Sequence, residues 1–197
     1  RLRSGDRLYN VLLMGEFAQD AGGPYRESFD TYMSELQSPV LSLLTRTPNG
    51  RHGAGQNREK WVLNPSATSR IELEMLEFVG KLLGIAIRSE NYLSLNFSSM
   101  IWKMLVGEEP VVSDLKEIDE SLVKNVIDFF NHLDMDRETF ETSFFETFTT
   151  LSTHDESVDL LPGGSELPVT FDNRTQYAQL VQNYKLHEFD VQVAAIR

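Results

Sequence analysis

The feature that most constrains the fold is a long apolar segment between Ser69 and Ile87. Its apolar residues fall on most sides of a helix and do not form a single stripe: Ile71, Leu73, Met75, Leu76, Phe78, Val79, Leu82, Leu83, Ile85 and Ile87. Such a pattern is typical of a helix surrounded by other helices. Gly80 and Gly84, four residues apart, would let a neighbouring helix come close. The segment therefore predicts a mainly helical domain built around one central helix.

Further helices are predicted on both sides of this segment. Pro24 fits a first helical turn, and a stripe follows it at helical spacing: Tyr25, Phe29, Met33 and Leu36. Asn96 is expected to cap another helix that ends at Gly107. Asp119 is expected to cap a helix with its own apolar stripe: Leu122, Val126, Phe129, Phe130 and Leu133. Asp172 is expected to cap one more, and a last helical segment should run from Glu188 to the end.

A few short strands complete the prediction. Leu8, Val11 and Leu13 suggest an opening strand, and residues 61–63 suggest another before a turn. Residues 158–161 and 167–170 are predicted to form a hairpin joined by a turn at 162–164. Residues 45–60 are rich in Gly, Asn and Arg without an apolar repeat, so we expect an exposed, mobile loop there.

Charge is distributed unevenly along the chain, which has a net charge of -12. Residues 107–172 contain 3 basic and 17 acidic side chains, whereas residues 1–106 contain 12 and 11 and residues 173–197 contain 3 and 2. Such a shift predicts a small subdomain at 107–172 and a large one made of 1–106 and 173–197. The acidity disfavours nucleic acid as a partner and favours a basic protein.

Several classes of chemistry lack the residues they need. The chain has no cysteine, which excludes disulfides, thiolate metal sites and thiol nucleophiles within it. Its four histidines are scattered, and no phosphate-binding loop or serine-nucleophile motif is present. We therefore expect no metal, no cofactor and no catalytic residue in this chain. No run of eighteen apolar residues exists, so we expect a cytoplasmic protein without a membrane span.

Phenylalanine is concentrated in the acidic region. Six of the twelve phenylalanines fall within twenty residues: Phe129, Phe130, Phe140, Phe144, Phe145 and Phe148. They could form the miniature core of a small subdomain. Alternatively, several could line an exposed groove, because apolar patches with a polar rim usually mark protein interfaces. The sequence leaves both interpretations open for each ring.

Five groups of residues, in register over about 160 positions, match one family. They are Gly15, Glu16, Asp20, Gly22, Gly23, Arg26, Glu27 and Phe29; Asn64, Pro65 and Ser66; the run at 78–87; Asp114, Leu115 and Asp119; and the run at 160–173 with Tyr177. Together they resemble the N-terminal lobe of HECT-type ubiquitin ligases, and the opening motif is most similar to the giant HERC-type members. The resemblance implies an α+β, mainly α-helical lobe with a large helical subdomain and a small subdomain containing a short β-hairpin.

The resemblance also implies a function. In such ligases a ubiquitin-conjugating enzyme carrying ubiquitin as a thioester binds the small subdomain. Ubiquitin then passes to a cysteine in a hinged C-terminal lobe and on to a lysine of a protein substrate, which is bound by other parts of the ligase. A thiolate is a good nucleophile and its thioester stays reactive toward amines. Without a cysteine, this chain should position the partner and be inactive by itself.

Carried over to this sequence, the resemblance assigns a docking helix that presents Leu122, Val126, Phe129 and His132. Phe144 and Phe145 are the predicted opposite wall of the groove. The chain departs from the family at Ser28, where a bulky apolar residue is usual, and in the length of the loop at 45–60.

Two other functions stay open. The lobe could be a non-enzymatic scaffold that binds a different basic protein. A helical hydrolase using paired carboxylates such as Glu108 and Glu109 would turn over substrate without a partner, but it lacks a nucleophile.

Overall fold

The computed structural model describes Tyr9, Val11 and residues 23–197. The first half of the chain forms α1 (Gly23–Leu36), β1 (Leu44–Arg46), α2 (Pro48–His52), β2 (Trp61–Leu63), α3 (Arg70–Ser89), α4 (Ser99–Val106) and α5 (Val112–Ile118). The second half forms α6 (Glu120–Leu122), the π-helix η1 (Val123–Asp128), α7 (Phe129–His132), α8 (Arg137–Ser143), β3 (Thr149–Leu151), β4 (Ser157–Asp159), the 3-10 helix η2 (Gly164–Glu166), α9 (Arg174–His187) and α10 (Asp190–Ile196). The predicted α+β, mainly helical class is confirmed. Apart from Val11, the predicted opening strand lies outside the described residues.

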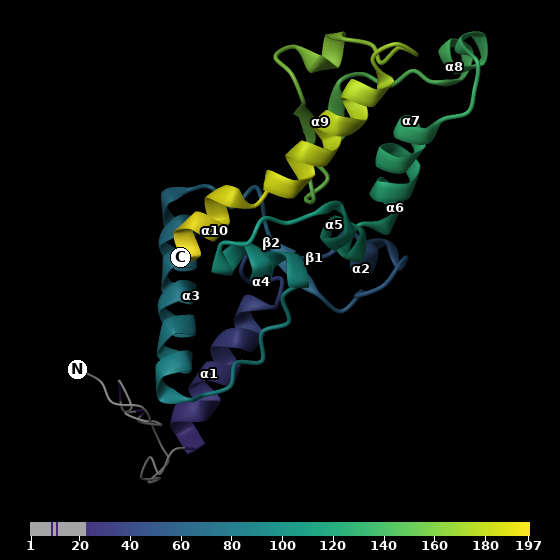
Figure 1. Cartoon of the computed structure of the whole chain (residues 1–197). Coiled ribbons are helices and arrows are strands. Elements are labelled where there is room, and N and C mark those ends of the chain that lie inside the picture. Colours follow the sequence, from purple (N-terminus) through teal and green to yellow (C-terminus); the bar gives the residue numbers. More distant parts are fainter. Residues whose placement is uncertain (1–8, 10, 12–22) are drawn as a thin grey trace.

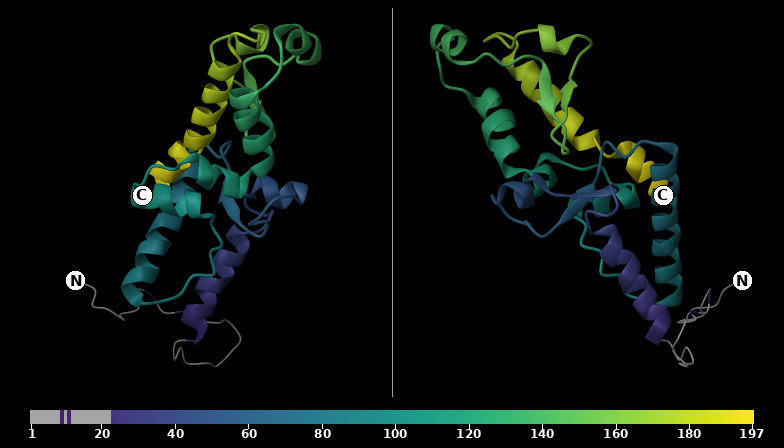
Figure 2. Two further views of the ribbon diagram at one scale, coloured as in Figure 1. Left: turned by 45° about the vertical axis from the view of Figure 1, so that its right-hand side comes forward. Right: turned by 180° about the vertical axis from the view of Figure 1, so that it is seen from behind.

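Two antiparallel hairpins accompany the helices. β1 pairs with β2, and β3 pairs with β4. In Figures 1 and 2, α1 and α3 extend from one side of the β1–β2 hairpin, while α6, α7 and α9 extend from the other. The molecule is therefore elongated, and the β3–β4 hairpin lies beside α9 and not beside α1.

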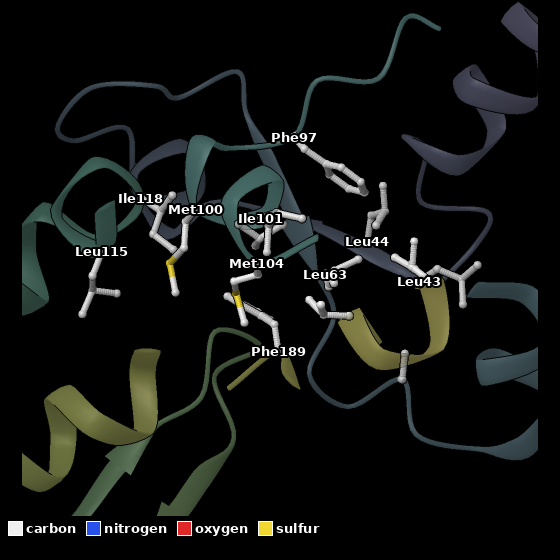
Figure 3. Packing of buried hydrophobic residues seen from close by; sticks show 14 of the residues in the cluster. Leu43, Leu44, Leu63, Phe97, Met100, Ile101, Met104, Leu115, Ile118 and Phe189 are labelled. Carbon is white, nitrogen blue, oxygen red and sulfur yellow. The ribbon is translucent and has the colours of Figure 1, made fainter. Parts of the chain in front are cut away.

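A shared apolar core joins the elements around the β1–β2 hairpin (Figure 3). Its fully buried members come from β2, from α4 and α5, and from residues shortly before β1, α4 and α10: Leu43, Leu63, Phe97, Met100, Ile101, Leu115, Ile118 and Phe189. Because these residues are far apart in the sequence, the core ties the start of the chain to its end.

The Asn-Pro-Ser turn at residues 64–66 is held by its own side chains. The Asn64 amide donates to the Ser42 carbonyl over 2.7 Å and accepts from the Ser66 backbone N–H over 3.0 Å. Gln192 of α10 donates to the Pro65 carbonyl over 2.9 Å. The turn therefore connects β2, the segment before β1, and α10.

The central helix is only partly surrounded. Ser69 and Glu72 form a capping box at the N-terminus of α3, and its buried residues lie on one side: Leu76, Val79, Leu82 and Ala86. In contrast, the side chains of Ile71, Phe78 and Ile87 are 70%, 51% and 79% exposed. The prediction that other elements surround α3 is therefore wrong at these positions, because α10 and the core cover only part of its circumference.

The glycine pair of α3 has two different environments. A Cβ atom at Gly80 would lie 1.9 Å from the Ile196 carbonyl oxygen of α10, whereas a Cβ at Gly84 would meet nothing within 4 Å. The predicted close approach of a second helix is confirmed at Gly80 and wrong at Gly84.

The predicted helix ends are partly confirmed. α1 buries the predicted stripe, α4 ends at Gly107 with a φ of 83°, and the Asp119 carboxylate accepts from the Leu122 N–H over 3.0 Å. Asn96 is not a cap: Ser98 caps α4, and Asn96 accepts from Lys60 Nζ over 2.7 Å.

Asp172 does not cap α9 either. It pairs with Arg137 of α8, and Asn173 precedes the helix without a side-chain cap.

The segment at 45–60 is ordered, which corrects the prediction of a mobile loop. Thr47 caps α2, and the buried Asn49 side chain donates to the carbonyls of Gln56 and Glu117 over 3.1 Å each. The side-chain Oδ1 of Asn49 accepts from the Glu120 backbone N–H over 2.9 Å. The side chains of Thr47 and Asn49 make hydrogen bonds to backbone groups within and beside this segment. These bonds hold it in place without an apolar repeat.

The second hairpin has a different partner from the predicted one. β4 pairs with Thr149–Leu151 of β3 and not with residues 167–170. Residues 167–170 make one isolated bridge, Thr147 to Pro168. Proline has no N–H to donate, so this segment cannot extend the pairing at that position.

We predict opposite effects from alanine at the two glycines of α3. Gly80→Ala should lower the free energy of unfolding by about 1–3 kcal/mol, because the new methyl group collides with the backbone of α10. Gly84→Ala should leave it unchanged or raise it by up to about 1 kcal/mol, because alanine is the better helix former. Urea unfolding followed by circular dichroism measures both, and equal effects would contradict the packing described for α10.

Candidate protein-docking site

The predicted docking helix is built from three consecutive pieces, α6, η1 and α7. Val123, Ile127 and Phe130 form its buried face. The predicted docking residues Leu122, Val126 and Phe129 each precede one of these and are half-buried. The helix therefore has a second apolar stripe beside the one that its core requires.

A cavity of about 230 Å³ opens beside the first two of these residues. It is lined by residues of α2, the α6–η1 helix, the β3–β4 hairpin and α9: Pro48, Arg51, His52, Asp119, Ser121, Leu122, Asn125, Val126, Leu151, Ser152, Asp155 and Lys185. Leu151 of β3 contributes a side chain that is 57% exposed. An open depression with both polar and apolar lining thus exists next to the Leu122 helix.

The phenylalanines divide into two groups around Phe130. The rings of Phe130, Phe140 and Phe148 are buried. Phe130 contacts Phe140 at 6.1 Å between ring centroids and Tyr177 of α9 at 5.3 Å. These rings are core, as the first interpretation expected.

The other rings stay partly accessible. Phe129 and Phe144 are half-buried and lie 5.4 Å apart between centroids, so the docking helix and the end of α8 meet there. Phe145 is 82% exposed and has no ring contact within the described part of the chain. These three rings are partly accessible, but none of them lines the cavity beside Leu122, so an exposed aromatic groove stays a prediction.

The structure groups the predicted site residues into two neighbourhoods. Leu122 and Val126 line the cavity, whereas Phe129 and Phe144 pack against the buried Phe130 ring at the far end of the helix. His132 is exposed on the last turn of α7.

The region around the site is acidic, with 17 acidic and 3 basic side chains between residues 107 and 172, although the cavity itself is lined by charges of both signs. Two of the three basic residues between 107 and 172 are already paired, Lys124 with Glu120 and Arg137 with Asp172. The hydrogen bond from Arg137 lowers the pKa of the Asp172 carboxyl, and the bonds from Thr139 lower that of Asp136. Burial, in contrast, raises the pKa of the Asp119 carboxyl beneath the cavity. Residues 107–172 are therefore negative overall, and the carboxyls of Asp136 and Asp172 are ionised at neutral pH.

Sequence reasoning missed how the β3–β4 turn is fixed beneath this site. Arg51 of α2 binds the carboxylate of Asp155 and donates to the Thr153 carbonyl over 2.5 Å. Lys185 and Glu188 form a buried ion pair of 3.1 Å, and Glu188 also accepts from the Thr153 hydroxyl over 2.8 Å. One indication of this contact is present in the sequence, the cation Arg51, which could have been expected to pair with a carboxylate in the acidic region.

The described residues contain no group of three or more side chains suited to hold a metal ion. The helices of that same part of the chain include none with the length and apolarity to cross a membrane. What the site offers is apolar and aromatic surface in an acidic region, which is typical of protein binding.

Sequence comparison shows that this chain is similar to ubiquitin ligases. A family model described as HECT-domain (ubiquitin-transferase) matches residues 31–197. The chain is 38% identical over 191 residues, 97% of its length, to the E3 ubiquitin-protein ligase HERC2 of Mus musculus and of Homo sapiens. It is 31% identical over 206 residues, 93% of the chain, to the probable E3 ubiquitin-protein ligase HECTD4 of Homo sapiens. The chain spans only 4% of the length of HERC2 and 5% of HECTD4.

The division of the rings predicts unequal effects on stability. Phe140→Ala should lower the free energy of unfolding by about 3–5 kcal/mol, because it empties a fully buried site. Phe145→Ala should change it by less than about 0.5 kcal/mol, because that ring is exposed. Chemical unfolding of both variants checks this, and a large loss in Phe145→Ala would show that this ring belongs to the core.

Proposed function

Because the chain belongs to the HECT-domain (ubiquitin-transferase) family, we propose that residues 107–172 dock a ubiquitin-conjugating enzyme. The observation that carries the proposal is the second apolar stripe on the docking helix. Leu122, Val126 and Phe129 are half-buried although the core is already closed by their neighbours. Apolar side chains in this state become fully buried when a partner covers them, which releases about 25 cal/mol per Å².

The partner's contact would be an apolar loop placed over the junction of the docking helix and the end of α8. Phe129 and Phe144 supply rigid aromatic surface there, and aromatic anchors tend to dominate the energy of an interface. His132 would lie at the edge, and Phe145 would extend the opposite wall. The net negative charge of residues 107–172 favours a partner whose docking surface is basic, and it raises the rate of association.

The chemistry that follows docking lies outside this chain. A thiolate in a separate C-terminal lobe would attack the thioester carbonyl carbon, releasing the partner's thiol and taking ubiquitin as a new thioester. The amine of a substrate lysine would then attack that thioester, forming an amide bond and releasing the thiol. This lobe contributes position, by holding the donor close to the acceptor. With no cysteine, the chain alone would not form a ubiquitin thioester.

The proposal uses the division into a large subdomain of residues 1–106 and 173–197 and a small one of residues 107–172. α10 packs against α3 and α4, while α9 packs against η1 and α7. The chain would thus return to the large subdomain along α9, which touches the docking helix on its way. We propose the cytoplasm as the location, because its reducing conditions keep a catalytic thiol free.

We predict that Val126→Asp or Phe129→Asp abolishes binding of conjugating enzymes while the helical circular dichroism is retained. A buried carboxylate without a partner would oppose the association. Ile87→Asp on α3 is the matched control, because Ile87 is apolar, exposed and far from the site. A pull-down against a panel of conjugating enzymes, with and without ubiquitin attached, measures the effect.

Wild-type binding by the Val126 and Phe129 variants would remove the site assignment. Failure of the unaltered chain to bind any conjugating enzyme, together with capture of another basic protein through the same residues, would favour the scaffold function instead.

A further inference from the structure

An apolar groove lies between α1 and α3, away from the docking site. It encloses about 340 Å³ and is lined by residues of α1, of the segment before β1 and of α3: Tyr32, Met33, Glu35, Leu36, Leu41, Leu43, Ile71, Glu74, Met75, Phe78, Val79 and Leu82. Ile71 and Phe78 are more than half exposed, and the Phe78 ring meets Tyr32 edge to face at 6.5 Å. Exposed large apolar residues grouped around one hollow usually mark an interaction surface.

The walls of the groove determine how a partner can bind. Both long walls are helices, whose backbone N–H and C=O groups are bonded within the helix. A partner therefore cannot bind by adding a strand, and it must offer side chains. Ile71 and Leu82 are eleven residues apart on α3, which at about 1.5 Å per residue gives a groove about 16 Å long. That length matches three turns of a helix with apolar residues at positions i, i+4 and i+7.

The charge of the groove selects among amphipathic helices. Its only charged lining residues are acidic, Glu35 on α1 and Glu74 on α3, and none of its lining residues is basic. Glu74 already forms an ion pair with Arg70, whereas Glu35 has no ion pair within the described residues. A partner helix would place lysine or arginine beside its apolar stripe, opposite these carboxylates.

We propose that the groove between α1 and α3 binds a basic amphipathic helix of a separate protein. In Figures 1 and 2, α1 and α3 lie on the other side of the β1–β2 hairpin from α7 and α8. The helix and a conjugating enzyme can therefore be bound together. The groove is a second, independent recruitment surface that does not depend on the docking site described above.

The test uses the whole chain and three fluorescein-labelled peptides of about 15 residues, long enough to span the groove. The first has leucines on one helical face flanked by lysines, the second has glutamate in place of every lysine, and the third has the first peptide's composition with the leucines scattered. Fluorescence anisotropy measures binding. We expect only the first peptide to bind, and its affinity to fall as salt is added.

Substitutions then place the binding in the groove. Ile71→Glu should weaken binding at least tenfold. Glu35→Lys should weaken it several-fold, and it leaves the apolar lining residues of the groove unchanged. Ile87→Glu, on the same helix but outside the groove, should bind as the unaltered chain does. Thermal melts confirm that each variant is folded. The surface substitution Glu35→Lys keeps the test valid if Ile71→Glu is unstable.

Three results would overturn the proposal. The first is equal binding of the three peptides, and the second is undiminished binding by both the Ile71 and Glu35 variants. The third is self-association of the chain through Ile71 in sedimentation experiments, which would make a second copy the occupant. Binding of a conjugating enzyme is expected to be unchanged in all three variants, so failure here is distinguishable from failure of the docking site.

Discussion

The edge-to-face contact between Phe130 of α7 and Tyr177 of α9 holds together everything that extends beyond the central core. Tyr177 also meets Phe148 at 5.8 Å and donates its hydroxyl hydrogen to the Thr149 carbonyl over 3.2 Å. One tyrosine therefore joins the docking helix, the β3–β4 hairpin and α9. Burial raises the pKa of its hydroxyl, so the ring remains neutral there at physiological pH. With these rings committed to the interior, Phe129, Phe144 and Phe145 are the ones that stay partly or fully accessible.

Local signals in the sequence predicted the elements whose causes are local. The stripe of α1, the cap at Asp119 and the stop at Gly107 each depend on residues within one or two helical turns. Elements that depend on distant partners were not predictable in this way. Asn49 is buried because it bonds Glu117 and Glu120, and nothing in the composition of residues 45–60 reveals those partners. The same applies to the exposed face of α3, since an apolar residue alone does not show whether another element covers it.

The candidate site was predictable in kind but not in detail. The concentration of phenylalanine among acidic residues indicated an aromatic patch, yet Phe129 and Phe130 are neighbours with opposite roles. The π-helix at Val123–Asp128 contributes to this, because its wider turn shifts the phase of the apolar residues that follow it. Regular α-helical spacing predicts Leu122, Val126, Phe129 and Phe130 on a single stripe, although Phe130 is buried and the others are partly accessible. The cavity beside Leu122 also needed the β3–β4 hairpin, whose pairing the sequence did not reveal.

The most direct test of the central claim is a chemical-shift map of the chain while an unlabelled conjugating enzyme is added. Docking through the second apolar stripe predicts changes in the methyl signals of Leu122 and Val126 and in the ring signals of Phe129 and Phe144. The signals of the buried residues of α3, such as Leu76, should stay in place. Changes confined to α1 and α3, or no change with any conjugating enzyme, would contradict the account.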